Sequence, residues 1–421
     1  MSVARRVLPE APSRRGWCPS LARPMQTGDG LLARVHPPLG RLTAAQARAV
    51  AAGARRFGNG HVDVTARANL QIRGVTPETQ GPLARHLMAV GLGDVRADGG
   101  PQRLTLTAPL FDLDTLAEAV EALGRAVPGL PPKTLVAIED GGRFGLGEAD
   151  ADIHLRVVAP HGVAWALAGP DGPVWSAPVP PAQVLARVSH CLHALAESGV
   201  RRMRDLDAAH RDRLVGAPMP APTPIQPMAP GLHDFGDGRT ALAVEAAFGR
   251  CTADGLDRLA DWTERLASPH LALGQTRGFV LVTREREGAR MVLDALGGQG
   301  FIHAADDPRG HVAACPGAPA CASGSTPTLD DAARLAEALR GTGIDAHVSG
   351  CAKGCAHPGP AALTLVGRAG RYGIVLHGRP DGEPAMQLTF EAALDRVRRA
   401  DSAGTLDRAF ALDQAFRTPI P

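Results

Sequence analysis

The segment 311–358 reads HVAACPGAPACASGSTPTLDDAARLAEALRGTGIDAHVSGCAKGCAHP and contains four of the chain's seven cysteines. They form two pairs, Cys315 and Cys321 with five residues between them, and Cys351 and Cys355 with three. Between the pairs, residues 329–340 have the periodicity of an amphipathic helix and 344–348 that of a strand. A loop, a helix, a strand and a second loop can fold both pairs onto one site. Because four thiolates are the ligand set of an iron–sulfur cluster, the segment predicts a cluster held by these cysteines.

Three other interpretations of the cysteines stay open. A structural zinc site is one, although zinc knuckles usually have two to four residues between cysteines. Disulfides are a second, but the other cysteines, Cys18, Cys191 and Cys251, are scattered, which is unlike a disulfide framework. The third is a set of unligated thiols in loops that are rich in glycine and proline.

Composition narrows the class of protein. The chain has 421 residues, 44% of them hydrophobic, and a formal net charge of +2. This length allows two or three domains with real cores. The small net charge argues against a nucleic-acid binder, and the absence of an 18-residue apolar run predicts no membrane span. The first 16 residues contain arginines but no apolar core, so we expect no signal peptide and a cytoplasmic protein.

Lysine is almost absent from the chain. Of 45 basic residues only Lys133 and Lys353 are lysines, and the rest are arginines. Lysine has a compact ammonium group where arginine has a planar guanidinium, so the two are not interchangeable in a site. Lys353 lies between Cys351 and Cys355, which makes both lysines candidate site residues. The alternative is that two lysines survived by chance.

An internal repeat organises most of the chain. The sequence GDGLLARV at 28–35 resembles GDGRTALAV at 236–244. In both copies a helical stretch follows (43–57, 252–266), then a strand pair broken at an arginine (Arg67 in 61–75, Arg277 in 270–283), then another helical stretch (77–90, 284–296). A fainter second repeat pairs 113–169 with 329–378. Its first copy carries Lys133 where the second carries Cys351 and Cys355. The alternation of strands and helices predicts an α+β fold.

A proline-rich stretch separates the two copies. APMPAPTPIQPMAPG at 217–231 contains six prolines and predicts an extended, semi-rigid linker.

The two halves and the two cysteine pairs together resemble the nitrite/sulfite reductase superfamily. The stretch TARANLQ at 65–71 is similar to that family's arginine-bearing substrate strand. The resemblance implies pseudo-twofold, duplicated ferredoxin-like half-domains with two α/β domains, a siroheme and a 4Fe–4S cluster. On this basis we expect a half-domain at 20–95, an α/β domain at 96–213, the linker at 214–231, a second half-domain at 232–303, and a cluster-bearing α/β domain at 304–421.

Finer motifs resemble one branch of this superfamily, the precorrin-3B synthases of aerobic cobalamin biosynthesis. These motifs are RRGWCPSLARPMQTGDGLLARV, LPPK, EDGGRF, ACPGAPACASG and HVSGCAKGCAHP. The reductases have two lysines spaced by one residue after the proline, whereas Leu135 follows Lys133 here at that spacing. The missing lysine weakens a cradle for a small oxyanion.

This resemblance implies an oxygen-dependent monooxygenase. It would hydroxylate a meso carbon of precorrin-3A, with O2 and a reductant (NADH or an electron-transfer protein), and close a lactone from a ring acetate. The tetrapyrrole would occupy a cleft between the halves, where siroheme lies in the reductases. A mononuclear non-haem iron or a siroheme is expected near the cluster. His311 and His357 could serve such an iron, although a structural role is commoner for a histidine.

A precorrin carries many carboxylates, which arginine binds in a bidentate manner. We expect Arg67, Lys133 and Lys353 to be catalytic and a set of arginines to bind substrate; for any single arginine the alternative is a solvated surface charge. The substrate-binding candidates are Arg23, Arg34, Arg73, Arg96 and Arg277, and Arg103 and Arg143 are further basic candidates.

Two other functions remain open at this stage. One is a siroheme-dependent sulfite or nitrite reductase. The other is a non-enzymatic iron–sulfur electron-transfer protein, although such carriers are usually small, whereas this chain has two duplicated halves.

Overall fold

A computed structural model describes residues 17–158, 162–400 and 403–411. The N-terminal residues that predict the absence of a signal peptide lie outside these ranges. The described residues divide into two compact units. The larger contains 17–25 and Leu31–His303, and the smaller contains Gln26–Gly30 and the chain from Ala304 onward. Each is described by itself, and the finer five-part division stays a prediction.

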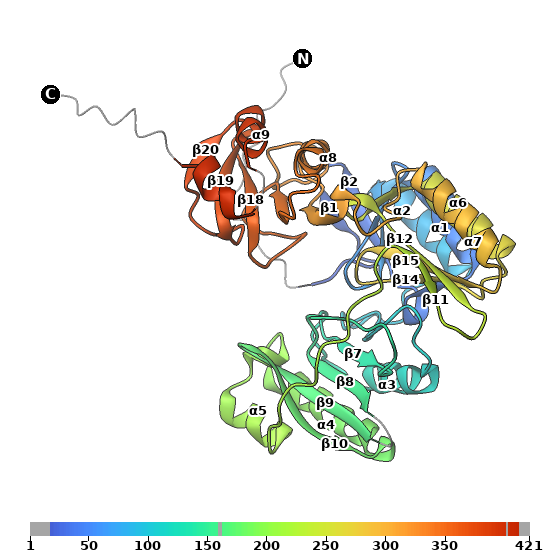
Figure 1. Cartoon of the computed structure of the whole chain (residues 1–421). Helices are drawn as coiled ribbons and strands as arrows, with labels where there is room; N and C mark the ends of the chain where they lie inside the picture. Colours follow the sequence, from blue (N-terminus) through green and yellow to red (C-terminus); the bar gives the residue numbers. More distant parts are fainter. Residues whose placement is uncertain (1–16, 159–161, 401–402, 412–421) are drawn as a thin grey trace. The chain divides into compact units, whose positions relative to one another are not determined.

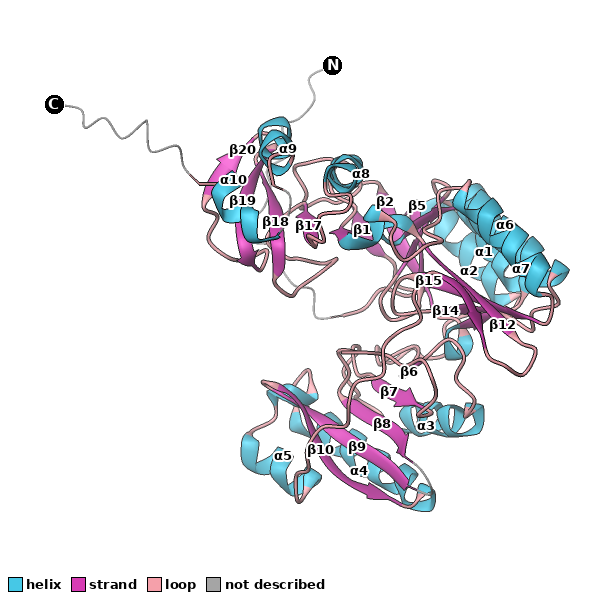
Figure 2. Cartoon of the chain, in the orientation of Figure 1, coloured by secondary structure: helices cyan, strands magenta, loops and turns pink. Residues whose placement is uncertain are grey.

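Four sheets, each accompanied by helices, make up the described chain (Figure 1, Figure 2). Strands and helices mix within every part, so the predicted α+β class is confirmed. None of the described helices is long and apolar enough to cross a membrane.

Two of the sheets belong to the first repeat and lie in the larger unit. One has the order β2-β5-β4-β13 and the other β11-β12-β15-β14-β3; β1 (Met25–Thr27) precedes β2. Helices α1 and α6 pack on each other, and Figure 2 shows them beside α2 and α7. The elements of the first copy are β2 (Gly30–Val35), β3 (Arg41–Leu42), α1 (Ala44–Phe57), β4 (His61–Val64), β5 (Leu70–Val75) and α2 (Pro77–Met88). Those of the second are β11 (Gly231–Asp234), β12 (Thr240–Glu245), β13 (Arg250–Thr252), α6 (Ala253–Arg265), β14 (Leu271–Leu273), β15 (Gly278–Thr283) and α7 (Arg286–Gly297).

The same helix caps and turns begin the corresponding helices in both copies. Thr43 caps α1 and Thr252 caps α6, each by accepting a hydrogen bond from a backbone N–H of the first turn. Before each cap the chain passes through a left-handed residue, Leu39 with φ 48° and Phe248 with φ 55°. The same irregular turn at the same place confirms that the two halves are structural repeats.

Each copy donates one short strand to the sheet of the other. Strand β13 of the second copy pairs with β4 of the first, and β3 of the first pairs with β14 of the second. A buried ion pair holds the exchanged strand β13 against β4. Asp63 of β4 accepts hydrogen bonds from Arg73 at 3.1 Å and from Arg250 of β13 at 2.7 Å. The two half-domains also share one hydrophobic core.

The third sheet completes the larger unit with the order β10-β9-β8-β7-β6. Strands β6, β7 and β8 run parallel, and β9 and β10 continue antiparallel. The sequence did not predict β10. The bounds are β6 (Thr105–Thr107), α3 (Asp114–Ala126), β7 (Val136–Glu139), β8 (Ile153–Val158), β9 (Gly162–Gly169), β10 (Gly172–Val179), α4 (Pro181–Ser198) and α5 (Ala208–Val215).

The proline-rich stretch that follows α5 has no helix and lies along this sheet's loops. Its backbone carbonyls at Thr223, Ile225 and Gln226 accept hydrogen bonds from Arg156, Gly147 and Gly145, respectively. The linker is therefore extended, as predicted, and also bound to its neighbours.

The smaller unit repeats the third sheet. Its order is β16-β17-β18-β19-β20, with two parallel and then two antiparallel pairings. The fainter repeat is therefore confirmed at the level of topology. The bounds are β16 (Val312–Ala314), α8 (Thr328–Ala338), β17 (Ala346–Ser349), β18 (Ala361–Arg368), β19 (Arg371–Gly378), β20 (Met386–Leu388), α9 (Phe390–Val397) and α10 (Leu406–Ala409).

Candidate functional site

A cavity of about 280 Å³ in the larger unit is lined by cations. Its walls come from the N-terminal segment 17–23, the end of β2, the β4–β5 loop, the segment 96–103 and the loop before β7. Asp98 is the one carboxylate among its lining residues, so the cavity has a clear excess of positive charge. The arginines that line it are Arg23, Arg34, Arg67, Arg96 and Arg103.

Two of these arginines form ion pairs or hydrogen bonds with other parts of the protein. Arg96 forms an ion pair with Asp98 and donates to the carbonyls of Gly124 and Val127 at 2.6 and 3.0 Å. Arg103 donates to the carbonyls of Pro37, Arg67, Ala68 and Thr105. Burial and the nearby Arg67 lower the pKa of Arg103 to about 10, with a partial offset from Glu121. Both guanidiniums therefore link segments that are distant in the sequence.

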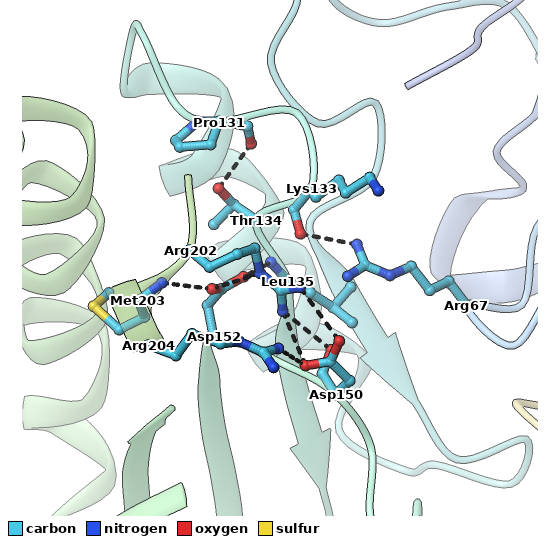
Figure 3. Close-up of polar contacts among 10 residues, drawn as sticks. All are labelled: Arg67, Pro131, Lys133, Thr134, Leu135, Asp150, Asp152, Arg202, Met203 and Arg204. Carbon is cyan, nitrogen blue, oxygen red and sulfur yellow. Dashed lines mark hydrogen bonds and ion pairs between the residues drawn. The ribbon is translucent and has the colours of Figure 1, made fainter. Parts of the chain in front are cut away.

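Arg67 is held at its tip and retains free donors. Its Nη1 donates to the main-chain carbonyl of Lys133 at 2.8 Å, as Figure 3 shows. Burial lowers the pKa of Arg67, and Arg202 lowers it further, whereas Asp152 and Asp150 oppose both effects. No other side-chain hydrogen bond of Arg67 is found within the described ranges. The remaining donors of Arg67 can therefore bind an anion in the cavity.

The Lys133 carbonyl is itself fixed by a buried carboxylate. Asp152 is fully buried and accepts hydrogen bonds from the backbone N–H groups of Leu135 and Met203 at 3.0 and 2.8 Å. It also accepts from Nε of Arg202 at 3.0 Å, and Arg202 bonds in turn to Asp150 (Figure 3). This chain of contacts fixes the loop 131–135 and, through it, Arg67. Asp152 could not be predicted from the sequence, because nothing local marks a buried aspartate as an anchor.

Arg34 and Arg23 complete the cationic side of the cavity. Arg34 donates to Oε1 of Gln71 at 2.7 and 3.2 Å, and burial lowers its pKa while the adjacent Cys18 raises it. Arg23 stacks on the ring of Trp17, with 4.4 Å from its guanidinium carbon to the ring centroid. Cation–π stacking leaves the N–H edge of a guanidinium available.

His36 lies among these cations and was not predicted as a site residue. It follows β2 and lines the cavity. Burial, together with Arg34 and Arg103, holds its pKa well below the usual value. Its imidazole is therefore neutral in a neutral solution.

Four predicted residues lie elsewhere or face differently. Arg73 is buried in its ion pair with Asp63, with a side-chain exposure of 3%, and it is not among the residues lining the cavity. Arg277 has φ 64° in the β14–β15 loop and packs beside Gly249, and it is not among the residues lining the cavity. The side chain of Lys133 is exposed, and Pro132 and Leu135 line the cavity instead. Arg143, another candidate, donates to the carbonyl of Asp234 at 2.8 Å.

The smaller unit brings the four cysteines together. Cys315 is buried at the end of β16, and its sulfur accepts a hydrogen bond from the Gly350 N–H at 3.1 Å. A Cβ on Gly350 would come within 3.2 Å of Gly317 and Gly324, which is tighter than most real Cβ contacts, so glycine suits the close approach of the two loops. All four thiols are free of disulfides.

The thiols influence one another electrostatically. Desolvation by the surrounding loop, with the charges of Cys315, Cys351 and Cys321, raises the pKa of the Cys355 thiol to about 11, although the residue as a whole is exposed. The pKa of Cys351 is raised by burial and by Cys321 and Cys315, and Lys353 partly offsets this. Four mutually repelling thiolates are stabilised by a cationic metal core. The arrangement therefore fits the ligand set of an iron–sulfur cluster.

The flanking histidines do not form a second metal site. His311 Nδ1 pairs with Asp345 at 2.9 Å, and His357 Nε2 lies 3.1 Å from the Pro360 carbonyl. Throughout 17–158, 162–400 and 403–411, no group of three or more histidine, cysteine, aspartate or glutamate side chains is placed to hold a metal ion. In a 4Fe–4S cluster each thiolate binds its own iron, so the four cysteines need not converge on one ion.

Comparisons with known proteins agree with this architecture. The family model for the nitrite/sulfite reductase ferredoxin-like half domain matches residues 23–90. The structure of the Mycobacterium tuberculosis NirA protein superimposes with a TM-score of 0.68 and covers 88% of this chain and 80% of its own, at 21% sequence identity. The fold is thus that of the NirA protein, with a nitrite/sulfite reductase ferredoxin-like half domain at residues 23–90.

The sequence relatives are more specific. A precorrin-3B synthase from Sinorhizobium sp. is 37% identical over 403 residues, which is 89% of this chain and 85% of that protein. A ferredoxin–nitrite reductase from Synechococcus elongatus is 27% identical over 284 residues, and the match spans about half of it, 51%. The chain belongs to the precorrin-3B synthase family, which confirms the expectation from the motifs.

Proposed function

We propose that this protein is a monooxygenase that converts precorrin-3A to precorrin-3B with O2 and a reductant, either NADH or an electron-transfer protein. The reaction hydroxylates a meso carbon and closes a lactone with a ring acetate. The observation that carries the proposal is the arginine-lined cavity in a chain of this family. A substrate with many carboxylates needs several cations, and here five arginines line one cavity with a single aspartate.

The size of the cavity limits what it can take. About 280 Å³ lies just below the roughly 300–1,000 Å³ of ordinary ligand pockets. A volume this small suits one edge of a macrocycle with its carboxylates rather than the whole ring with its side arms. We therefore assign the cavity to one edge of the precorrin.

The roles of the residues follow from their contacts. Arg67 binds a carboxylate with the donors that the Lys133 carbonyl leaves free, and Arg23 and Arg34 neutralise the same edge. Leu135 presents an apolar wall that suits a macrocycle better than a small oxyanion. The exposed ammonium of Lys133 is available to carboxylate arms at the surface. We assign Lys353 to the cysteine loop, where its charge lowers the pKa of the neighbouring thiols.

Cys315, Cys321, Cys351 and Cys355 are proposed to hold a 4Fe–4S cluster. When bound, a cluster of this kind supplies electrons one at a time, which oxygen chemistry requires and side chains do not provide. Because free thiols persist in a reducing compartment, the proposal includes a cytoplasmic location. The described histidines do not support a mononuclear iron, and we route no step through one. Siroheme remains the alternative second group.

The proposed reaction is tested by anaerobic reconstitution of the protein with iron and sulfide. Precorrin-3A, oxygen and a reductant are then added, and the products are identified by mass spectrometry. We expect a product with one additional oxygen atom and a lactone. Absence of any oxygenated product would overturn the proposal. Reduction of sulfite or nitrite, with a chlorin-type absorbance, would instead favour the reductase function.

The cluster assignment has its own test. We expect Cys321→Ser to lose the visible absorbance of the reconstituted protein, since one of four ligands is gone. Cys191→Ala is the matched control, because Cys191 is a buried thiol of α4 outside the four-cysteine site. Full absorbance and activity in Cys321→Ser would remove the cluster from these cysteines.

A further inference from the structure

His36 is an unpartnered polar group in a cavity built of donors. It lines the cavity with Arg34, Arg67 and Arg103, and neither of its ring nitrogens has a hydrogen-bond partner among the residues that the structure describes. Guanidinium groups only donate hydrogen bonds, so they offer nothing to the imidazole N–H. The imidazole is half-buried and lines the cavity, so a carboxylate that enters can supply an acceptor that the protein itself does not.

The charge around His36 explains its protonation state. Its pKa is held well below the usual value by burial first, and then by Arg34 and Arg103. These causes are reversible. A carboxylate that enters the cavity cancels the repulsion from the arginines and supplies the missing acceptor, and both effects favour the protonated imidazole.

We propose that His36 is a substrate-binding residue that takes up a proton when a carboxylate arm of the precorrin enters the cavity, and then donates a charge-assisted hydrogen bond to that arm. This inference rests on the proposed function, because it needs a polycarboxylate substrate. It adds to that function a residue that senses whether the arm is in place.

Other charged and titratable groups also face the cavity. They are Arg23, Arg34, Arg67, Arg96, Arg103, Asp98 and Cys18. Hydrogen bonds from Arg96 lower the pKa of Asp98 to about 2, so it stays ionised. Arginine side chains stay protonated in proteins. Carboxylates of the substrate titrate near pH 4. Only histidine changes charge between about pH 5 and 8 without a special environment.

The sign of the pH dependence follows from linkage. The pKa of His36 is depressed in the free protein and raised in the complex, so the complex binds one more proton between the two values. Binding is therefore tightest at low pH and weakens as pH rises through this window. The dissociation constant increases by up to about tenfold per pH unit, and it levels off above the pKa of the complex.

The experiment measures binding alone, without oxygen or reductant. Full-length protein is titrated anaerobically with precorrin-3A between about pH 5 and 8, and the proton uptake is followed with an indicator dye in weak buffer. In the wild type we expect the dissociation constant to rise with pH and about one proton to be taken up per ligand. In His36→Gln we expect a flat pH profile and no uptake, with His36→Asn as a second variant.

His270→Gln is the matched control. Its pKa is also lowered by burial and a neighbouring arginine, Arg41, but it lies just before β14 and is not among the residues lining the cavity. We expect this variant to retain the wild-type slope and uptake. Wild-type binding without pH dependence or proton uptake would overturn the role of His36 and leave the proposed function standing. No binding of precorrin-3A at any pH would overturn both. Proton uptake on binding is measured with the wild-type protein, so the test remains valid even if a substituted protein misfolds.

Discussion

Arg67 and Arg73 lie close in sequence on the same strand-loop-strand segment, but they do different things. Arg67 has free donors in the cavity, and Arg73 is buried against Asp63. We expect Arg67→Ala to weaken precorrin-3A binding by about tenfold to a hundredfold, because a charge-assisted hydrogen bond contributes roughly 1.5–3 kcal/mol. Its free energy of unfolding should change little. Binding by absorbance titration and unfolding in urea are the two measurements.

Arg73→Ala is the counterpart of this variant. It leaves Asp63 buried with Arg250 alone, so we expect the free energy of unfolding to fall by about 3 kcal/mol. Binding of precorrin-3A by the folded fraction should stay near that of the wild type. If both variants lost binding to the same degree, the separation of the two roles would be wrong.

Residue type alone could not separate these arginines. The sequence predicts an arginine-rich site, and Arg23, Arg34, Arg67 and Arg96 do line one cavity. It does not predict that Arg96 and Arg103 are bound to backbone carbonyls of distant segments, because every residue has such an acceptor and only the fold places it. His36 was missed for the same reason, since its surroundings come from other segments of the chain.

At the scale of elements, the loop 131–135 links a buried carboxylate to the cavity. Asp152→Asn removes the charge that holds Arg202 and weakens the anchor at the Leu135 N–H. We expect the Michaelis constant for precorrin-3A to rise about tenfold through a loosened Arg67, at a similar turnover number. Steady-state kinetics with variants shown to be folded by circular dichroism provide the measurement.

Two further variants test how much Asp150 and the Lys133 side chain contribute to the change in the Michaelis constant. Asp150→Asn removes a carboxylate from the same charged group, but Asp150 is 63% exposed and does not bond to the loop, so we expect less than about a threefold change. Lys133→Ala keeps the carbonyl that accepts from Arg67. If the Michaelis constant of Lys133→Ala stays within about twofold of the wild type, the loop acts through the Lys133 carbonyl that accepts from Arg67. A larger rise would show that the Lys133 ammonium itself contributes to substrate binding.

Most of the elements could be predicted because their signals are local. The helix at 43–57 is observed at Ala44–Phe57 with Thr43 as its cap, and the helix at 329–340 at Thr328–Ala338. The strand β10 was missed because Gly172–Val179 contains two prolines, which argue against a strand unless it lies at an edge. It does lie at the edge of its sheet, which a sequence cannot reveal.

At the scale of the whole molecule, the exchanged strands join the two repeats. Cutting the chain within the linker leaves the first half without β13 and the second without β3. We expect each isolated fragment to lose protection of the β4 or β14 amides that bond to the exchanged strand, because that strand is missing while β5 and β15 remain on the other side. Co-expressed fragments should regain the protection of the uncut chain. Protection in an isolated fragment would show that the exchange is not needed for folding.

The exchanged strands also limit how the two copies of the repeat can diverge. A deletion in β13 shortens the edge of the first sheet, and a deletion in β3 shortens the edge of the second. Neither copy can therefore be shortened or replaced at these strands without a matching change in the sheet of the other copy. The loops are free of this constraint, and they hold Arg67 in the first copy and the four cysteines in the fainter repeat. The two copies can therefore change separately in their loops but only together at the exchanged strand edges.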